Sequence, residues 1–158
     1  MELKLALGLC QLFSLIVFGM LGGWYVVPWL RLQNRGTALI ALLSPHLFRY
    51  IALQAYSAQR AGFPISDSAL SRIVYGDVAG AVLALAAIVA LRHASRAAVP
   101  MVWVLVVATI VDTVLNIAGG IRENLFGAAS NVTWLVVGFY VPLLMVPLLV
   151  SVRQNESP

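Results

Sequence analysis

Charged residues are scarce in this chain. Of its 158 residues, 10% are Asp, Glu, Lys or Arg, and 61% are hydrophobic. Soluble domains average about 25% charged and about 45–50% apolar residues. This shortage of charge argues against an ordinary soluble domain and indicates a protein that follows the rules of the lipid bilayer.

Basic residues are too dispersed to form a surface for nucleic acid. The net charge is +4, and the arginines stand singly between apolar segments. A nucleic-acid site needs basic residues clustered along one face. We therefore expect no nucleic-acid partner, and we interpret the positive charge as loop charge that orients the chain and meets anionic headgroups.

Metal and cofactor ligands are equally few. Cys10 is the single cysteine, so neither an intrachain disulfide nor a thiolate metal site can form. The two histidines, His46 and His93, fall too far apart along the membrane normal to hold a haem between them. No phosphate-binding loop, dinucleotide fingerprint or nucleophile elbow is present. We expect no metal and no cofactor.

Long apolar runs are what the chain has instead. A spanning helix needs about 20 residues, and five segments qualify: residues 5–30, 37–59, 73–91, 99–121 and 132–152. The sequence predicts an all-α polytopic membrane protein, a bundle of five transmembrane helices with short loops, in one domain over residues 1–158. Loops this short make consecutive helices antiparallel neighbours. Membrane lipid is therefore an expected partner.

The first run differs from a cleaved signal peptide. A signal core is about 7–15 residues long and ends in small residues, whereas this run is longer and ends in bulky ones, Trp24 to Trp29. We expect a retained helix with an aromatic belt at its far end.

Loop charge gives a prediction of orientation. Basic residues in the cytoplasmic loops should be in the majority. One side would carry five and the other four: Arg31, Arg35, Arg92, Arg96 and Arg153 against Lys4, Arg60, Arg72 and Arg122. This favours an outside N-terminus and a cytoplasmic C-terminus.

Three charged residues lie inside the apolar runs: Arg49, Asp77 and Asp112. A guanidinium at mid-membrane costs about 2.5–3.5 kcal/mol on insertion scales, so it requires a partner. Counted from the starts of their segments, Arg49 and Asp112 lie at nearly equal depth, and we predict that they pair, with Asp77 as second choice. We place Asp77 about 6 Å inside the other surface, nearest to Asn116 and Gln54.

Two helix faces collect polar residues. At 100° per residue, one face of the second segment carries His46, Arg49, Tyr50, Leu53 and Ser57, and one face of the fourth carries Thr109, Asp112, Asn116, Gly119 and Glu123. Pro45 should kink the second segment just before His46, and Pro142 and Pro147 should loosen the fifth. Glycines spaced by four, at 19 and 23 and at 76 and 80, predict close helix packing and leave a homo-oligomer face open as an alternative.

These residues define the candidate site. We expect Asp112 and Asp77 to act as catalytic acid and base. The expected ligand-binding residues are His46, Arg49, Tyr50, Asn116, Gln54, Tyr140 and Trp103. Each of them also has an ordinary structural role as a helix-to-helix hydrogen bonder or belt residue, and only their convergence favours a site.

Three functions fit this constellation. The first is a membrane protein whose polar pocket binds or acts on a small lipophilic molecule, possible chemistries being acid/base isomerisation and cyclisation. The second is a proton-coupled transporter or a subunit of an ion pathway, which the small size and the lack of a visible repeat disfavour. The third is an accessory or assembly subunit, in which an ion pair only fixes the register of the helices.

Overall fold

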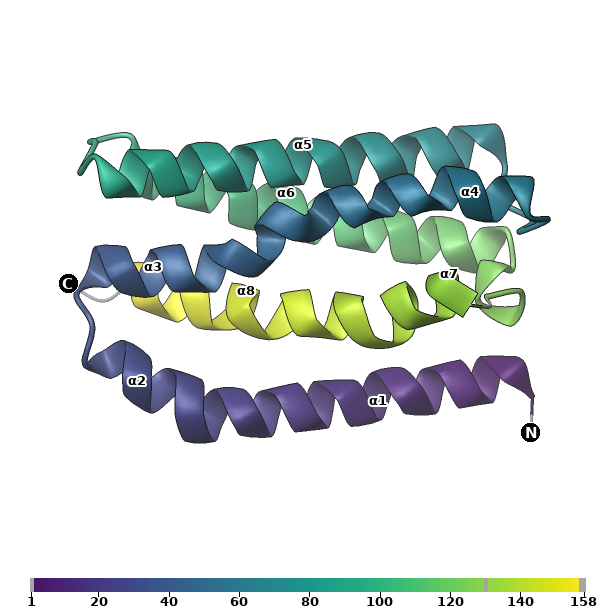
Figure 1. Cartoon of the computed structure of the whole chain (residues 1–158), viewed down its shortest axis with the longest axis horizontal. Coiled ribbons are helices and arrows are strands. Elements are labelled where there is room, and N and C mark those ends of the chain that lie inside the picture. Colours follow the sequence, from purple (N-terminus) through teal and green to yellow (C-terminus); the bar gives the residue numbers. More distant parts are fainter. Residues whose placement is uncertain (1, 130, 157–158) are drawn as a thin grey trace.

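The computed structural model describes residues 2–129 and 131–156, which form helices and short loops and contain no strand. The helices run lengthwise in one bundle (Figure 1). Their bounds in chain order are α1 Leu3–Leu21, π-helix η1 Gly22–Val26, α2 Val27–Arg31, α3 Arg35–Leu43, 3-10 helix η2 Ser44–Leu53, α4 Gln54–Arg60, α5 Asp67–Arg92, α6 Ala98–Arg122, 3-10 helix η3 Leu125–Gly127, α7 Asn131–Leu135, π-helix η4 Val136–Tyr140 and α8 Val141–Glu156.

These elements join into five helices that are long and apolar enough to cross a membrane: Leu3–Arg31, Arg35–Arg60, Asp67–Arg92, Ala98–Arg122 and Val132–Val150. The predicted fold class is confirmed. We refer to these helices below as the first to fifth spans.

The third span begins earlier than the sequence predicted. We expected it to start at Ile73, but α5 starts at Asp67 and has 26 residues. Ser66 caps it, because the hydroxyl of Ser66 accepts from the backbone N–H of Ala69 at 3.2 Å. A side-chain cap therefore extends the helix through a polar stretch that hydropathy alone had assigned to the loop.

The bundle has a packed centre and one peripheral span. The third span lies against both the fourth span and η2, while the first span lies against the fifth (Figure 1). Of the most apolar window of each span, 39% is buried in the second span and only 11% in the first. Consecutive spans are therefore neighbours, as expected, from the second span to the fourth. The first span differs, because its main neighbour is the fifth.

Two side chains of the first span donate hydrogen bonds to carbonyls of the π-helix η4 in the fifth span. Pro142 has no N–H, so the carbonyl four residues earlier, that of Gly138, lacks its usual helical donor. The thiol of Cys10 donates to this carbonyl at 3.7 Å, and the amide of Gln11 donates to the carbonyl of Val137 at 3.2 Å. A Cβ at Gly138 would lie 2.9 Å from Cys10 Sγ, so the glycine is what allows this approach.

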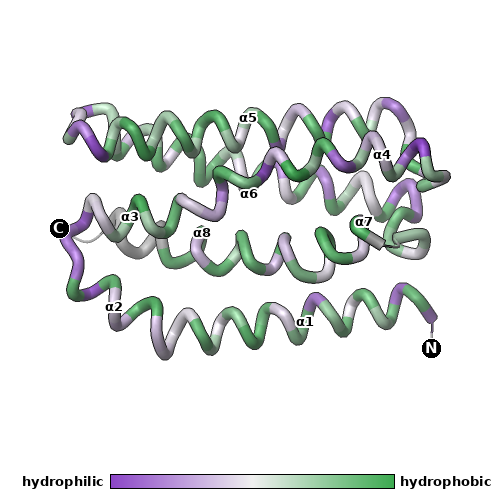
Figure 2. Tube along the Cα trace, viewed as in Figure 1, coloured by the Kyte–Doolittle hydropathy of each residue, from purple (hydrophilic) through white to green (hydrophobic). Residues whose placement is uncertain are grey.

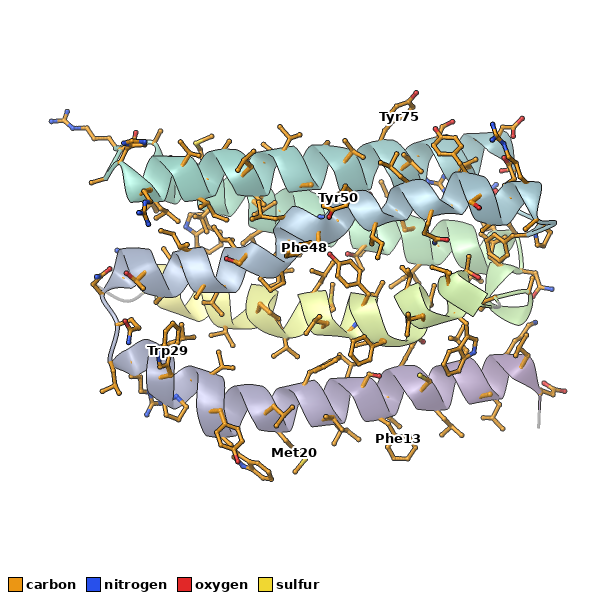
Figure 3. All side chains as sticks on the ribbon, viewed as in Figure 1. Phe13, Met20, Trp29, Phe48, Tyr50 and Tyr75 are labelled. Atoms are coloured by element: carbon orange, nitrogen blue, oxygen red, sulfur yellow. The ribbon has the colours of Figure 1, made fainter. Side chains whose placement is uncertain are left out.

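Large apolar side chains cover the outside of the bundle. Phe13 and Met20 point away from it on the first span, and Tyr75 points away on the opposite side, from α5 (Figure 3). The aromatic residues expected in the belt, Trp24 and Trp29, are 63% and 45% exposed. This outward apolar surface is what a helix bundle in lipid presents.

The two halves of the bundle differ in polarity. In the tube coloured by hydropathy, α4 and the adjoining parts of α5 and α6 carry far more hydrophilic colour than the half that contains α3 (Figure 2). That second half contains the main apolar core, which comprises Leu39, Leu43, Ala84, Ala87, Val102, Leu105, Val106 and Leu148. The candidate site lies between this core and the polar end.

At the polar end, Glu123 fastens two loops together. Its carboxylate accepts from the backbone N–H of Ser66 at 3.0 Å and from the Ser66 hydroxyl at 2.7 Å. The contact joins the residue that caps α5 to the residue that follows α6. These two bonds, the backbone one first, hold the pKa of Glu123 below its ordinary value of 4.5.

This contact predicts a pH dependence of stability. A carboxyl group whose pKa is lower in the folded state contributes stability above its unfolded pKa and loses it as the pH falls through the folded value. We expect the melting temperature of the wild type to exceed that of Glu123→Gln at neutral pH, and the difference to vanish below the lowered pKa of Glu123. Thermal unfolding in detergent between neutral and acidic pH measures this, with Glu2→Gln as control at the same end. A difference that did not change with pH would contradict it.

Candidate functional site

The second span buries a different face from the one expected. Residues Ser44–Leu53 form a 3-10 helix that begins beside Pro45, and in such a helix residues three apart eclipse one another. The buried residues are accordingly His46, Arg49 and Ala52. The prediction that Tyr50 shares the face of Arg49 is wrong, because the tighter winding turns Tyr50 outward, where it is 53% exposed and contacts Phe48 (Figure 3).

Arg49 is the centre of the site. Its side chain is 3% exposed. The guanidinium donates from Nε to Asp77 Oδ1 at 2.8 Å, from Nη1 to Thr109 Oγ1 at 2.9 Å, and from Nη2 to Asp112 Oδ2. The predicted pair with Asp112 is present, and Asp77, the second choice, contacts Arg49 as well. The three nitrogens therefore bind oxygens from two neighbouring spans.

The cluster lies near the middle of the bundle. Asp77 is ten residues after Asp67, where α5 begins, and Asp112 is ten residues before Arg122, where α6 ends. Each is therefore about 15 Å from its helix end, about half the 30 Å of a hydrocarbon core. The prediction that Asp77 lies near the surface is wrong, because the capped start of α5 moved the helix end outward by six residues.

Two glycines of α5 make room for the charged groups. A Cβ at Gly80 would lie 2.6 Å from Arg49 Nη1 and 2.7 Å from Arg49 Cζ, and a Cβ at Gly76 would collide with Asp112 Oδ1. The spacing of these glycines by four predicted close packing between helices. What packs against them is the guanidinium and the carboxylate, so both glycines belong to the site. Sequence reasoning missed this role. Gly76 is adjacent to Asp77 and Gly80 follows it by three residues, and this proximity to a buried charge could have indicated it.

The cluster has one more acid than base. It contains one guanidinium and two carboxyl groups, and it becomes neutral when it takes up one proton or one further positive charge. Uncompensated charge in a low-dielectric interior is costly. Exposed fractions of 22% for Asp77 and 16% for Asp112 show that the carboxyl groups, unlike the guanidinium, retain some accessible surface.

A cavity of about 210 Å³ lies beside these carboxyl groups. All five spans contribute to its wall, which is mostly apolar. Along α6 it extends from Thr109 to Gly120, about 16 Å of helix from the rise per residue. Its lining comprises Gln11, Arg49, Ala52, Gln54, Ala55, Phe63, Ile65, Ile73, Asp77, Thr109, Asp112, Thr113, Asn116, Ile117, Gly120, Leu125, Phe126, Ala129, Thr133, Val136, Val137, Val141, Leu144 and Met145.

The structure brings together five of the predicted site residues at this cavity: Arg49, Gln54, Asp77, Asp112 and Asn116. Asn116 Nδ2 donates to Asp112 Oδ1 at 3.1 Å, so its amide orients the carboxylate. Thr109, which sequence reasoning placed on the polar face but not in the site, is a direct partner of Arg49.

The other four predicted residues lie outside the cavity lining: His46, Tyr50, Tyr140 and Trp103. The hydroxyl of Tyr140 donates to the carbonyl of Pro45 at 3.0 Å, and Trp103 is 36% exposed on the surface of α6. His46 is fully buried, and neither ring nitrogen has a hydrogen-bond partner among the described residues.

The site has no evident metal-binding geometry. Within residues 2–129 and 131–156, no three side chains of His, Cys, Asp or Glu lie together in a way that could hold a metal ion. What the arrangement offers chemically is a pair of carboxyl groups at the wall of an apolar space, held by a shared guanidinium.

Comparison with known proteins identifies a family. The profile of a domain of unknown function, DUF8737, matches residues 6–154, so the chain belongs to this family. No curated protein matches the chain, and no solved structure does.

The cluster predicts an unequal cost for removing its charges. Breaking a buried ion pair from one side typically costs about 3–5 kcal/mol, because the remaining charge is left uncompensated. We expect Arg49→Met to lower the free energy of unfolding by about that much, and the triple variant with Asp77→Asn and Asp112→Asn to recover part of it. Unfolding in detergent, followed by circular dichroism, measures this, with the exposed Arg60→Met as control. Equal stability of the Arg49 and Arg60 variants would contradict the role of the cluster.

Proposed function

We propose that this DUF8737 protein is a multi-pass membrane protein that binds a small lipophilic molecule in the cavity beside Arg49 and transfers protons to and from it. The observation that supports the proposal is the cavity itself. It is mostly apolar, and the carboxyl groups of Asp77 and Asp112 lie at its wall. An apolar pocket with a few convergent polar groups is the usual form of a ligand site.

The volume limits the ligand. A cavity of about 150 Å³ can hold a benzene molecule, whereas sites for drug-sized molecules measure roughly 300–1,000 Å³. At about 210 Å³, this cavity fits a single ring or a short stretch of one chain. Its length along α6 favours the chain, so we propose a slender molecule whose remainder extends into lipid.

The chemistry we propose is acid/base catalysis. With one proton on the pair, one carboxylic acid can protonate a carbon or oxygen of the ligand while the other carboxylate accepts a proton from it, as in an isomerisation or a cyclisation. Proton number is conserved, because the proton that enters the ligand is replaced by the one that leaves. Arg49 positions both groups, and Asn116 orients Asp112 through its amide.

The cavity also weighs against the third function considered, that of an accessory subunit. In such a subunit the ion pair would need only to set the register of the helices, and a filled core would serve it best. The orientation with an outside N-terminus and the homo-oligomer remain predictions from the sequence. Gly19 and Gly23, the candidate contact face, have open space where a Cβ would lie.

The first test removes the carboxyl groups. We expect Asp112→Asn and Asp77→Asn each to fold and to lose the lipophilic molecule that co-purifies with the wild type, or to retain it unconverted. Organic extraction of the purified protein followed by mass spectrometry measures this. Asp67→Asn is the matched control, because Asp67 lies at the exposed start of α5. If nothing co-purifies with the wild type, and neither variant differs from Asp67→Asn, the proposed function is wrong.

The second test narrows the cavity without touching a charge. Ile117 and Ile110 lie seven residues apart on α6 and are each 47% exposed, but only Ile117 is part of the cavity lining. We expect Ile117→Trp to reduce the amount of bound molecule and Ile110→Trp to leave it unchanged, with similar melting temperatures. Equal retention by the two variants would argue against this cavity as the binding site.

A further inference from the structure

Polar contacts follow the seam between α5 and α6 from the membrane surface to the charged cluster. At the surface, Glu123 binds Ser66. At the inner end, Asn116 binds Asp112, and Asp112 binds Arg49. Asp112 and Asn116 of α6 are four residues apart, and Glu123, directly after α6, follows seven residues later, so the three lie along one face of the helix.

Arg72 fills the gap in this series. Position 119, between Asn116 and Glu123, is a glycine, and a Cβ there would collide with Nη2 of Arg72. The guanidinium of Arg72, which comes from α5, therefore lies against the backbone of α6 at the level where α6 itself offers no polar side chain. The seam thus presents a polar group at each successive turn of α6.

The same seam is apolar on the other side of the cluster. From Thr109 toward the start of α6, the residues that face the interior are Val106, Leu105 and Val102, each at most 2% exposed. They belong to the main apolar core, together with Ala84 and Ala87 of α5. These α5 and α6 residues offer water and protons no polar side chain. The polar side chain that the second span places on this side of Arg49 is His46, which is fully buried and has no hydrogen-bond partner among the described residues.

The cavity has the same asymmetry. Its lining includes Phe63, Ile65, Leu125 and Phe126 from the loops at the polar end, and on α6 it ends at Thr109. The seam and the cavity therefore reach toward the same face of the bundle, and the apolar core separates both from the opposite face.

We infer that the carboxyl groups of Asp77 and Asp112 exchange protons with water at one membrane face only, the face that carries Ser66 and Glu123. Water carries the proton along a route lined by Glu123, Arg72 and Asn116, because a guanidinium and an amide do not themselves release and take up protons. The route ends at the cluster, where Arg49, Asp77 and Asp112 face one another from three spans. A proton from water reaches a carboxylate and leaves by the same route, so no net transfer across the membrane results. This goes beyond the proposed ligand, because it holds whether or not the cavity is occupied.

The inference is tested by one-sided chemical access. In a chain whose single cysteine is replaced (Cys10→Ser), we introduce Asn116→Cys or, as matched control, Leu105→Cys. Asn116 lies six residues from the end of α6 and Leu105 seven residues from its start, so the two positions have similar depth from opposite faces. Sealed vesicles of both orientations are treated with a small, membrane-impermeant methanethiosulfonate. Two exposed positions, Ser68→Cys and His93→Cys, report the two faces.

We expect Asn116→Cys to react only from the face where Ser68→Cys reacts, and Leu105→Cys to react from neither face. If Asn116→Cys does not fold, Thr113→Cys replaces it. Thr113 lines the cavity, and none of the hydrogen bonds of the cluster involves it. Reaction of either cavity position from the His93 face, or reaction from no face, overturns the inference. Labelling needs no bound ligand, so this failure is distinguishable from a failure of the extraction experiments.

Discussion

A guanidinium shared between two carboxyl groups is the interaction on which this bundle depends. Lipid cannot solvate Arg49, so the second, third and fourth spans must be placed where its three nitrogens find oxygens. That requirement fixes the rotation and depth of all three spans at once. It also explains the glycines at 76 and 80, because a side chain at either position would occupy the volume that the charged groups need.

Local winding makes this arrangement possible. An α-helix through residues 44–53 would turn Tyr50 toward the interior together with Arg49, whereas the 3-10 helix stacks His46, Arg49 and Ala52 in a single column. This column runs from the half of the bundle that contains α3 toward the half that contains α4. The cavity adjoins its α4 end, where Arg49, Ala52 and Gln54 belong to the lining, and the apolar core lies toward α3.

Sequence reasoning correctly predicted those features of the structure that depend on one dominant physical effect. Hydropathy predicted five spans, and the cost of an unpaired guanidinium predicted the partner of Arg49. It failed where two physical effects compete. Hydropathy placed the start of the third span at Ile73, but the cap at Ser66 starts the helix six residues earlier. The 100° period of an α-helix placed Tyr50 inside, but the 3-10 winding that begins beside Pro45 turns it outward. A pocket beside the charged residues was expected, but its extent and lining could not be predicted, because they depend on how side chains from all five spans meet.

The attachment of the first span has its own mechanical consequence. This helix is bonded to the fifth span through the carbonyls of Val137 and Gly138, it packs on the second span through Leu30, and its Gln11 forms part of the cavity wall. Because no residue of the first span belongs to the ion cluster or to the main apolar core, a change in its position would leave both of them intact. For the function proposed above, this makes the first span the wall of the cavity whose displacement would admit a lipid-soluble molecule.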